Sequence, residues 1–244
     1  MNARLQFLPQ ICAFALATLL AACVQLPGEA SRSAARPIAE AGDTTQHQFK
    51  VINRLTWGAS ASAAREIAES GTARFIEAQL HPTPSGRMPA EVEAQISAMT
   101  ISQRPMTELV VELKQRRRET DAIADPDQKK AAQQAYQQEL NRLTNETATR
   151  FVLRALYSPE QLREQMTWFW MNHFNLFQYK SDIRRLLADY EERAIRAHAL
   201  GKFRDLVAAT VHHPAMLRYL DNEQNAAGRI NENYADRKST RLNS

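Results

Sequence analysis

The feature that most limits the fold of this chain is its long series of helix-forming segments with almost no glycine between them. The 244 residues include only seven glycines, whereas alanine, leucine, glutamine, glutamate and arginine are abundant. These side chains lose little rotamer freedom in a helix. No stretch of useful length alternates apolar and polar residues with a period of two, as a half-buried strand would. The sequence therefore predicts an all-α protein, an irregular multi-helix bundle without a substantial sheet.

The first helices are predicted from caps and breakers. Ser60 and Gly71 bracket a helix over residues 61–70, and Thr72 is expected to cap the next one. Ahead of them, QHQFKVINRLTWGAS predicts a helix that stops near Gly58 and turns Phe49 and Ile52 inward.

Two longer helices follow, separated by a break at residues 125–127, and the second is expected to run to Tyr157. The first carries a basic run, Lys114 and residues 116–118, which could bind anionic lipid or polysaccharide. Acidic residues flank this run and no aromatic residue interrupts it, which favours a solvated helix face instead.

The motif SPEQ predicts the start of another helix, with Ser158 as its cap and Pro159 in its first turn. A wide apolar stripe with one histidine then follows at helical spacing: Leu162, Met166, Phe169, Trp170, His173, Phe174 and Phe177. A further helix is expected from Ser181 to Gly201, and a short one is opened by Pro214, with His213 as a candidate cap.

The N-terminal segment MNARLQFLPQICAFALATLLAAC has one cation, Arg4, and an apolar core too short for a stable membrane span. Residues 1–22 therefore read as a cleaved export signal, with a buried N-terminal helix as the alternative. The ending LAAC resembles the lipobox of bacterial lipoproteins, which implies lipidation of Cys23 and anchoring in a membrane. In that pattern Val24 after the cysteine points to the outer membrane, on its periplasmic side.

Residues 23–45 are rich in small residues and proline, and we expect a flexible tether between the anchor and a helical domain over residues 46–235. The second cysteine, Cys12, leaves with the signal, so no disulfide framework is predicted. The formal net charge is +4, but Arg4 and the last nine residues account for most of it. The folded body is close to neutral and gives no indication of nucleic-acid binding.

No strong catalytic or metal-binding signature occurs: there is no H-E-x-x-H, paired C-x-x-C, P-loop, dinucleotide turn or nucleophile elbow. Polar residues instead gather in four motifs, WFWMNHFNLF, YEERAIRAHALGKFRDL, HHPAMLRYLDN and NENYA. These motifs closely resemble those of the bacterial family known as domain of unknown function 1800, and INRLTWGAS resembles its opening LNRLTFGPT. The resemblance implies an exported, largely helical protein whose activity is not established.

The last nine residues, DRKSTRLNS, depart from that pattern, because the family continues after NENYA with a helix like RELLELHTLG. The nonapeptide is the translation of GAT CGG AAG AGC ACA CGT CTG AAC TCC, a common sequencing-adapter read. We therefore expect residues 236–244 to be an assembly artefact and the helical domain to be truncated at its C-terminus.

Two hypotheses about function follow. In the first, the chain is a non-catalytic envelope lipoprotein that binds a protein or polysaccharide. In the second, it is an exported enzyme whose acid/base groups, or whose ligands to a metal or haem, converge between helices. The candidate catalytic residues are His173, His198, Asp221 and Glu232. The candidates for a ligand-binding or polar network are Asn172, Glu191, Asn222, Asn231 and Asn233, and no metal or other cofactor is assigned.

Each candidate also has a structural interpretation. His173 could be a hydrogen-bonded core residue. Glu191 stands seven residues before His198, a spacing at which its carboxylate could orient the imidazole along one helix, although this spacing is no standard metal site. Asp221 and Asn222 could form a plain turn at a helix end.

Overall fold

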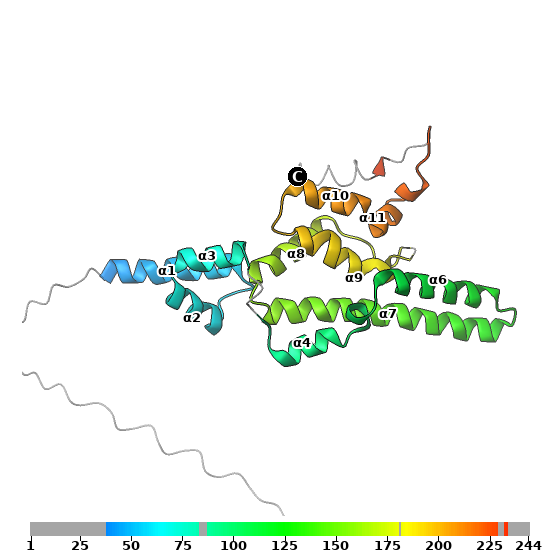
Figure 1. Ribbon diagram of the computed structural model, residues 1–244, viewed down its shortest axis with the longest axis horizontal. Helices are drawn as coiled ribbons and strands as arrows, with labels where there is room; N and C mark the ends of the chain where they lie inside the picture. Colours follow the sequence, from blue (N-terminus) through cyan, green and yellow to red (C-terminus); the bar gives the residue numbers. More distant parts are fainter. Residues whose placement is uncertain (1–37, 83–86, 181, 229–231, 234–244) are drawn as a thin grey trace, which may run out of the picture. The chain divides into compact units, whose positions relative to one another are not determined.

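The computed structural model describes residues 38–82, 87–180, 182–228 and 232–233, with side chains from Thr45 onward. The chain divides into units of residues 1–38 and 39–244, and the described fold belongs to the second. All regular elements of these residues are helical (Figure 1), which confirms the predicted all-α class. The predicted signal peptide, Cys23, most of the tether and the C-terminal nonapeptide lie outside the described residues.

Three N-terminal helices pack around a small core of their own. They are α1 (Ile38–Leu55), α2 (Ala61–Ser70) and α3 (Thr72–Leu80). Their buried contacts join Ile52, Ala63, Ile67 and Phe75. The predicted bounds of α2 are confirmed, and the Ser60 hydroxyl accepts a hydrogen bond of 3.1 Å from the Ala63 backbone N–H.

Three details of this region differ from the prediction. Helix α1 begins at Ile38, inside the segment expected to be a tether, because alanine and glutamate extend the helix backward. Gly71, not Thr72, precedes α3, and its φ of 81° is one that glycine adopts without strain. Phe49 does not point inward, since its side chain is 55% exposed.

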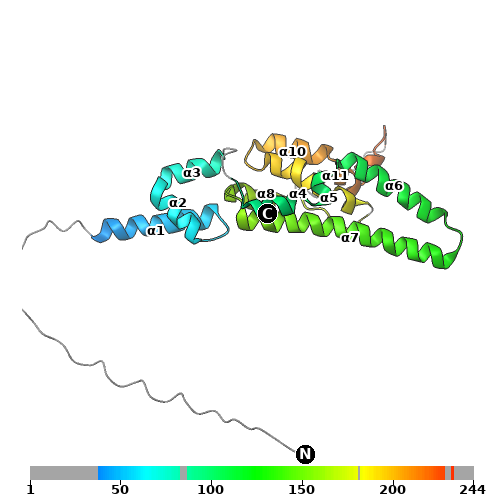
Figure 2. The ribbon, with the colours of Figure 1, turned by 60° about the horizontal axis from the view of Figure 1, so that its bottom comes forward.

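The middle of the chain forms a helical hairpin. Short helices α4 (Ala90–Ser97) and α5 (Thr100–Gln103) precede α6 (Met106–Ala122) and α7 (Pro126–Tyr157). Figures 1 and 2 show α6 and α7 side by side, joined at the predicted break, where Asp125 caps α7. Leu113 of α6 packs on Tyr136, Leu140 and Leu143 of α7. The basic run of α6 is exposed, as predicted for a solvated face.

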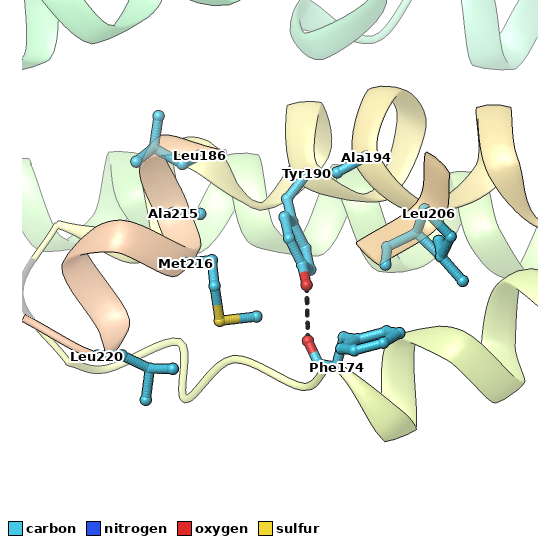
Figure 3. Close-up of a cluster of buried hydrophobic side chains, with 9 residues drawn as sticks. Phe174, Leu186, Tyr190, Ala194, Leu206, Ala215, Met216 and Leu220 are labelled. Atoms are coloured by element: carbon cyan, nitrogen blue, oxygen red, sulfur yellow. Dashed lines mark hydrogen bonds between the residues drawn. The ribbon is translucent and has the colours of Figure 1, made fainter. Parts of the chain in front are cut away.

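The second half of the domain packs on α7. Its elements are α8 (Gln161–His173), the 3₁₀ turn η1 (Ile183–Leu186), α9 (Leu187–Asp189), the π turn η2 (Tyr190–Ile195), the 3₁₀ turn η3 (Arg196–His198), α10 (Phe203–His212), α11 (Pro214–Tyr219) and the 3₁₀ turn η4 (Asn222–Gln224). The single helix predicted up to Gly201 is thus a succession of helical turns of different pitch. The fully buried Tyr190 lies at the centre of the core and donates a 2.7 Å hydrogen bond to the Phe174 carbonyl (Figure 3).

Two predictions about α8 were partly wrong: the residue at which the helix begins, and which residues of the apolar stripe are buried. The helix begins at Gln161, and Ser158 ends α7 instead of capping α8. Phe169 and Phe177 are about half exposed, whereas Glu164 and Thr167 are fully buried. The polar side chains occupy the inner face because they have partners there, while Phe169 and Phe177 lie toward the surface and Phe174 lies in the core.

Candidate functional site

A groove forms where the N-terminal helices meet the turn between α7 and α8. We call it the Trp57 groove. It encloses about 490 Å³ and is lined by residues 56–60, 62, 63 and 66, by Phe75 and Gln79, and by residues 155–159 and 161. This volume lies within the usual range for small-ligand sites.

Aromatic residues of both walls line the Trp57 groove: Trp57 and Phe75 on one wall and Tyr157 on the other. Trp57 is 42% exposed and meets Trp168 edge to face, with ring centroids 5.9 Å apart. The Trp57 ring also meets Phe151 edge to face at 6.2 Å, so Trp168 and Phe151 support it from outside the groove lining. Tyr157, also about half exposed, lines the groove across from the α1–α2 turn. Rings held in this way present a rigid apolar surface with polar tips, which suits ligand contact at low entropic cost.

The polar lining of the groove is almost uncharged. Among the described lining residues, Ser60, Ser62, Gln161 and Tyr157 carry neutral hydrogen-bonding groups, and Glu66 is the one charged side chain. The groove therefore favours a neutral ligand that combines apolar faces with hydroxyl or amide groups.

The side chain of Gln79 fixes the two walls of the groove to each other. Its Nε2 donates to the Pro159 carbonyl at 3.0 Å, and its Oε1 accepts from the Leu162 N–H at 3.1 Å. Gln165 of α8 donates in turn to the Thr56 carbonyl. Gln79 is only 3% exposed, so both of its bonds are made away from water.

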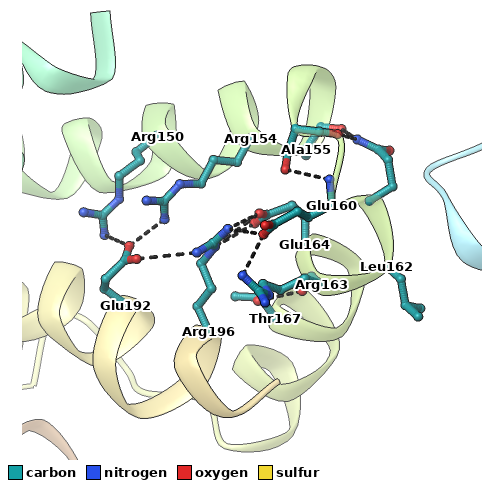
Figure 4. Close-up of polar contacts among 12 residues, drawn as sticks. Arg150, Arg154, Ala155, Glu160, Leu162, Arg163, Glu164, Thr167, Glu192 and Arg196 are labelled. Carbon is teal, nitrogen blue, oxygen red and sulfur yellow. Dashed lines mark hydrogen bonds and ion pairs between the residues drawn. The ribbon is translucent and has the colours of Figure 1, made fainter. Parts of the chain in front are cut away.

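Behind the α7–α8 turn lies a network of arginine and glutamate side chains (Figure 4). Arg196 binds Glu164 through Nη2 at 2.7 Å and Nε at 3.1 Å, and reaches Glu160 at 3.1 Å. Arg154 of α7 binds Glu192 at 2.6 Å. Glu160 and Glu164 lie at the start of α8, next to the α7–α8 turn that forms one groove wall. The network therefore stabilises this wall from the interior of the domain.

The π turn η2 directs two successive carboxylates to the same pair of guanidinium groups. Arg150 lies 3.3 Å from Glu191 and 3.7 Å from Glu192, and Arg154 contacts both as well. Burial raises the pKa of Glu191 above its ordinary value despite these arginines. Burial acts in the same direction on Glu192, but Arg154 and Arg150 outweigh it and leave the pKa of Glu192 lowered.

The residues predicted as catalytic have different surroundings. His173 ends α8 and packs among the rings of Phe169, Trp170 and Phe174. His198 is half-buried at the end of η3. Asp221 ends α11 in a left-handed turn and forms a 2.7 Å ion pair with Lys180. Glu232 is exposed.

The candidates for a ligand-binding or polar network also lie in different surroundings. Glu191 is directed toward Arg150 and Arg154 of α7, not along its own helix toward His198 as the spacing suggested. The Asn172 amide donates to the Trp168 carbonyl within α8. Asn222 begins the turn η4, and Asn233 donates to the Leu220 carbonyl at 3.4 Å. Asn231 lies outside the described residues.

The described residues show neither a metal-binding cluster nor a membrane-spanning helix. No group of three or more histidine, cysteine, aspartate or glutamate side chains there is placed to hold a metal ion. In the same part of the chain, no helix combines the length and the apolar character that crossing a bilayer requires.

Sequence reasoning missed the arginine partners of the network and the groove. Arg150 and Arg154 recur on one face of α7, and Glu160 and Glu164 on one face of α8, each pair at a spacing of four. Charges repeated at this spacing beside apolar residues are a signal of a shared helix face. The groove had no such signal, because its walls are 100 residues apart in the chain.

The fold and its groove define an all-helical domain built around a buried ionic network and an exposed aromatic surface. Residues 50–236 match the family model described as "Protein of unknown function (DUF1800)". The chain therefore belongs to the domain of unknown function 1800 family, as its motifs indicated. Neither the curated proteins nor the solved structures that were compared include a match to this chain.

Proposed function

We propose that this protein is an exported lipoprotein, anchored through Cys23 to the periplasmic side of the outer membrane, and that it binds a neutral glycan of the cell envelope. The leader sequence supports the location: a short apolar segment ends in LAAC, directly before a stretch rich in small residues. Acyl chains contribute about 0.8 kcal/mol per buried methylene to such anchoring.

The observation that carries the binding proposal is the combination of exposed tryptophan and neutral polar groups in the Trp57 groove. A sugar ring has apolar C–H faces that stack on indole and hydroxyl groups at its rim that exchange hydrogen bonds. Trp57 supplies the stacking surface, while the exposed lining residues Ser62 and Tyr157 supply hydroxyl partners. The near absence of charge in the lining favours a neutral saccharide over an acidic one.

The location is tested with Cys23→Ser and with globomycin, an inhibitor of lipoprotein signal processing. We expect the unmodified chain to fractionate with the outer membrane and to incorporate labelled palmitate. The Cys23→Ser chain should incorporate none and should appear in the soluble or unprocessed fraction. Palmitate-free chains that still fractionate with the outer membrane would rule out anchoring at Cys23.

Glycan binding is tested by titration calorimetry of the full chain with soluble N-acetylglucosamine oligosaccharides. Trp57→Ala should weaken binding about tenfold or more, equivalent to about 1.4 kcal/mol. Trp57→Tyr should retain much of the affinity because it keeps a ring in the groove. Phe49→Ala is the matched control, since Phe49 is a similarly exposed aromatic residue outside the groove.

The lipid anchor and the glycan binding can be refuted independently of each other. A chain that is lipidated but binds no oligosaccharide would refute the glycan-binding role and leave the anchor in place. Equal losses of affinity in Trp57→Ala and Phe49→Ala would show that binding does not occur in the groove. Circular dichroism of each variant ensures that a loss of binding is not a loss of fold.

A further inference from the structure

A second pocket lies nearer the other end of α7, where η1 meets the α6–α7 hairpin. It encloses about 400 Å³, and we call it the Tyr136 pocket. Its lining consists of Arg117, Thr120, Asp121, Gln133, Tyr136, Gln137, Tyr179 and Arg184. Unlike the Trp57 groove, it is surrounded by guanidinium groups.

The carboxylate of Asp182, near this pocket, accepts hydrogen bonds from three arginines. Asp182 receives Arg117 at 2.8 Å through Oδ1, and Arg185 at 2.6 Å through Oδ2. Arg218 also reaches Oδ2, at 3.4 Å. Asp121 contacts Arg117 only at 3.8 Å and is 61% exposed, so it adds little compensation. Arg218 is also paired with Glu223, at 3.2 Å. The four arginines Arg117, Arg184, Arg185 and Arg218 thus face two close carboxylates, Asp182 and Glu223, and the cluster retains excess positive charge.

Several buried donors beside the pocket have no acceptor. The Arg185 side chain is only 2% exposed, yet its Nε and Nη1 make no hydrogen bond. The hydroxyl of the buried Tyr136 and Nε of Arg184 are also without partners. A buried donor left unsatisfied destabilises the protein, and more so when it is charged.

These groups are close enough to act on one another. Burial raises the pKa of Tyr136, Asp182 adds to that increase, and Arg185, Arg117 and Arg184 oppose it. Burial lowers the pKa of Arg185, and the neighbouring Arg218 and Arg117 lower it further, against the effect of Asp182. The lowered pKa of Arg185 is expected where cations outnumber the anions available to them, whereas the raised pKa of Tyr136 reflects its burial and the nearby Asp182.

From these contacts we infer that the Tyr136 pocket binds a phosphate group, held by two residues of its lining, Arg184 and Tyr136, with the buried charge of Arg185 close to Tyr136. All the unsatisfied atoms are donors, which a group offering only acceptor oxygens would complete. A phosphate presents more such oxygens than a carboxylate, and arginine matches its geometry well. The phosphate could belong to free orthophosphate or to a lipid headgroup, and the two sources are separated by experiment.

The test uses the full chain with Cys23→Ser, so that no acyl anchor contributes to vesicle binding. Inorganic phosphate is titrated by calorimetry at constant ionic strength, and vesicles of phosphatidylglycerol or phosphatidylcholine are tested by flotation. We expect phosphate binding that Arg184→Gln and Tyr136→Phe each weaken about fivefold or more. Additional flotation with phosphatidylglycerol vesicles, lost in the same variants, would identify a headgroup as the source.

The control is Arg116→Gln, which removes an exposed charge from α6 beyond the pocket lining. It should leave binding unchanged, because long-range attraction alone does not hold the phosphate. Tyr136→Phe should also leave the ligand-free protein as stable as before or more so, since it removes an unsatisfied hydroxyl. Absence of binding to both phosphate and vesicles, or equal weakening by Arg116→Gln, would overturn the inference.

Discussion

Arg196 and Glu164 face each other across the interior of the domain, with two guanidinium nitrogens within 3.1 Å of one carboxylate oxygen. The Glu164 side chain is only 1% exposed. Replacing Arg196 by methionine would leave this carboxylate buried without its main partner. We expect a loss of about 3–5 kcal/mol in the free energy of unfolding, measured by urea denaturation.

Two further variants test whether that loss of stability comes from the buried charge of Glu164. Arg193→Met removes an exposed arginine from the same segment, and its ion pair with Asp189 should be worth no more than about 1 kcal/mol. Adding Glu164→Leu to Arg196→Met should recover much of the lost stability, because no buried charge then remains. Equal stability of Arg196→Met and Arg193→Met would contradict the role assigned to the network.

Gln79→Ala tests the connection between the N-terminal helices and α8. Removing the amide leaves the Pro159 carbonyl and the Leu162 N–H without their side-chain partner, at a cost of about 1–3 kcal/mol for a buried group. The urea midpoint should fall, and limited proteolysis should cut the segment between α3 and α4 faster. Gln95→Ala, at an exposed position of α4, is the control and should change neither readout.

Tyr190→Phe tests the buried hydroxyl that bonds the Phe174 carbonyl in the main core. The ring keeps its packing, but the Phe174 carbonyl loses the 2.7 Å bond from the phenol. Thermal denaturation should show a loss of about 1–3 kcal/mol. Tyr179→Phe, at a side chain that is 61% exposed, should stay within about 0.5 kcal/mol of the original protein. Similar melting of both variants would mean that the buried bond contributes nothing.

The pair Asp189–His213 predicts a dependence of stability on pH. The hydrogen bond from His213 is the largest cause of the lowered pKa of Asp189. A carboxyl with a lowered pKa stabilises the fold above its ordinary pKa of about 3.9, and this contribution is lost as pH falls through the lowered value. Asp189→Asn should therefore reduce stability at pH 7 and flatten its decline below about pH 4.

Urea unfolding at a series of pH values measures that slope. Asp205→Asn provides the comparison, since Asp205 is an exposed carboxylate on α10. The Asp205→Asn protein should lose stability on acidification as steeply as the original. An unchanged slope in Asp189→Asn would show that the pair does not couple protonation to folding.

The helices that sequence reasoning located best are those with strong local signals. Ser60 and Gly71 fixed the ends of α2, and the break near Asp125 separated α6 from α7. His213 caps α11 as predicted, with Nδ1 accepting from the Ala215 N–H at 3.1 Å. In each case the deciding interaction spans only a few residues, so the sequence contains it directly.

The site depended on contacts that no local pattern contains. Arg150 meets Glu191 across 41 positions, and Trp57 meets Gln161 across 104. Which helix faces which is decided by the packing of the whole domain. The π turn at residues 190–195 was also invisible, because one extra residue in a turn barely changes the apolar period. Spacing therefore directed Glu191 toward His198 instead of α7.

The bonds made by Gln79 end on main-chain atoms of the α7–α8 turn, and the bond from Gln165 ends on the main chain of the α1–α2 turn. Backbone carbonyl and amide groups are the same whatever side chain is attached to them. Positions 159 and 162 can thus accept new side chains without changing these hydrogen bonds, provided that position 162 keeps its amide hydrogen, whereas the buried Thr56 is also held by its own hydroxyl. Each of these hydrogen bonds depends on only one side chain, that of Gln79 or Gln165. Other residues of the groove lining can therefore change in evolution while the bonds that hold the two walls together stay in place.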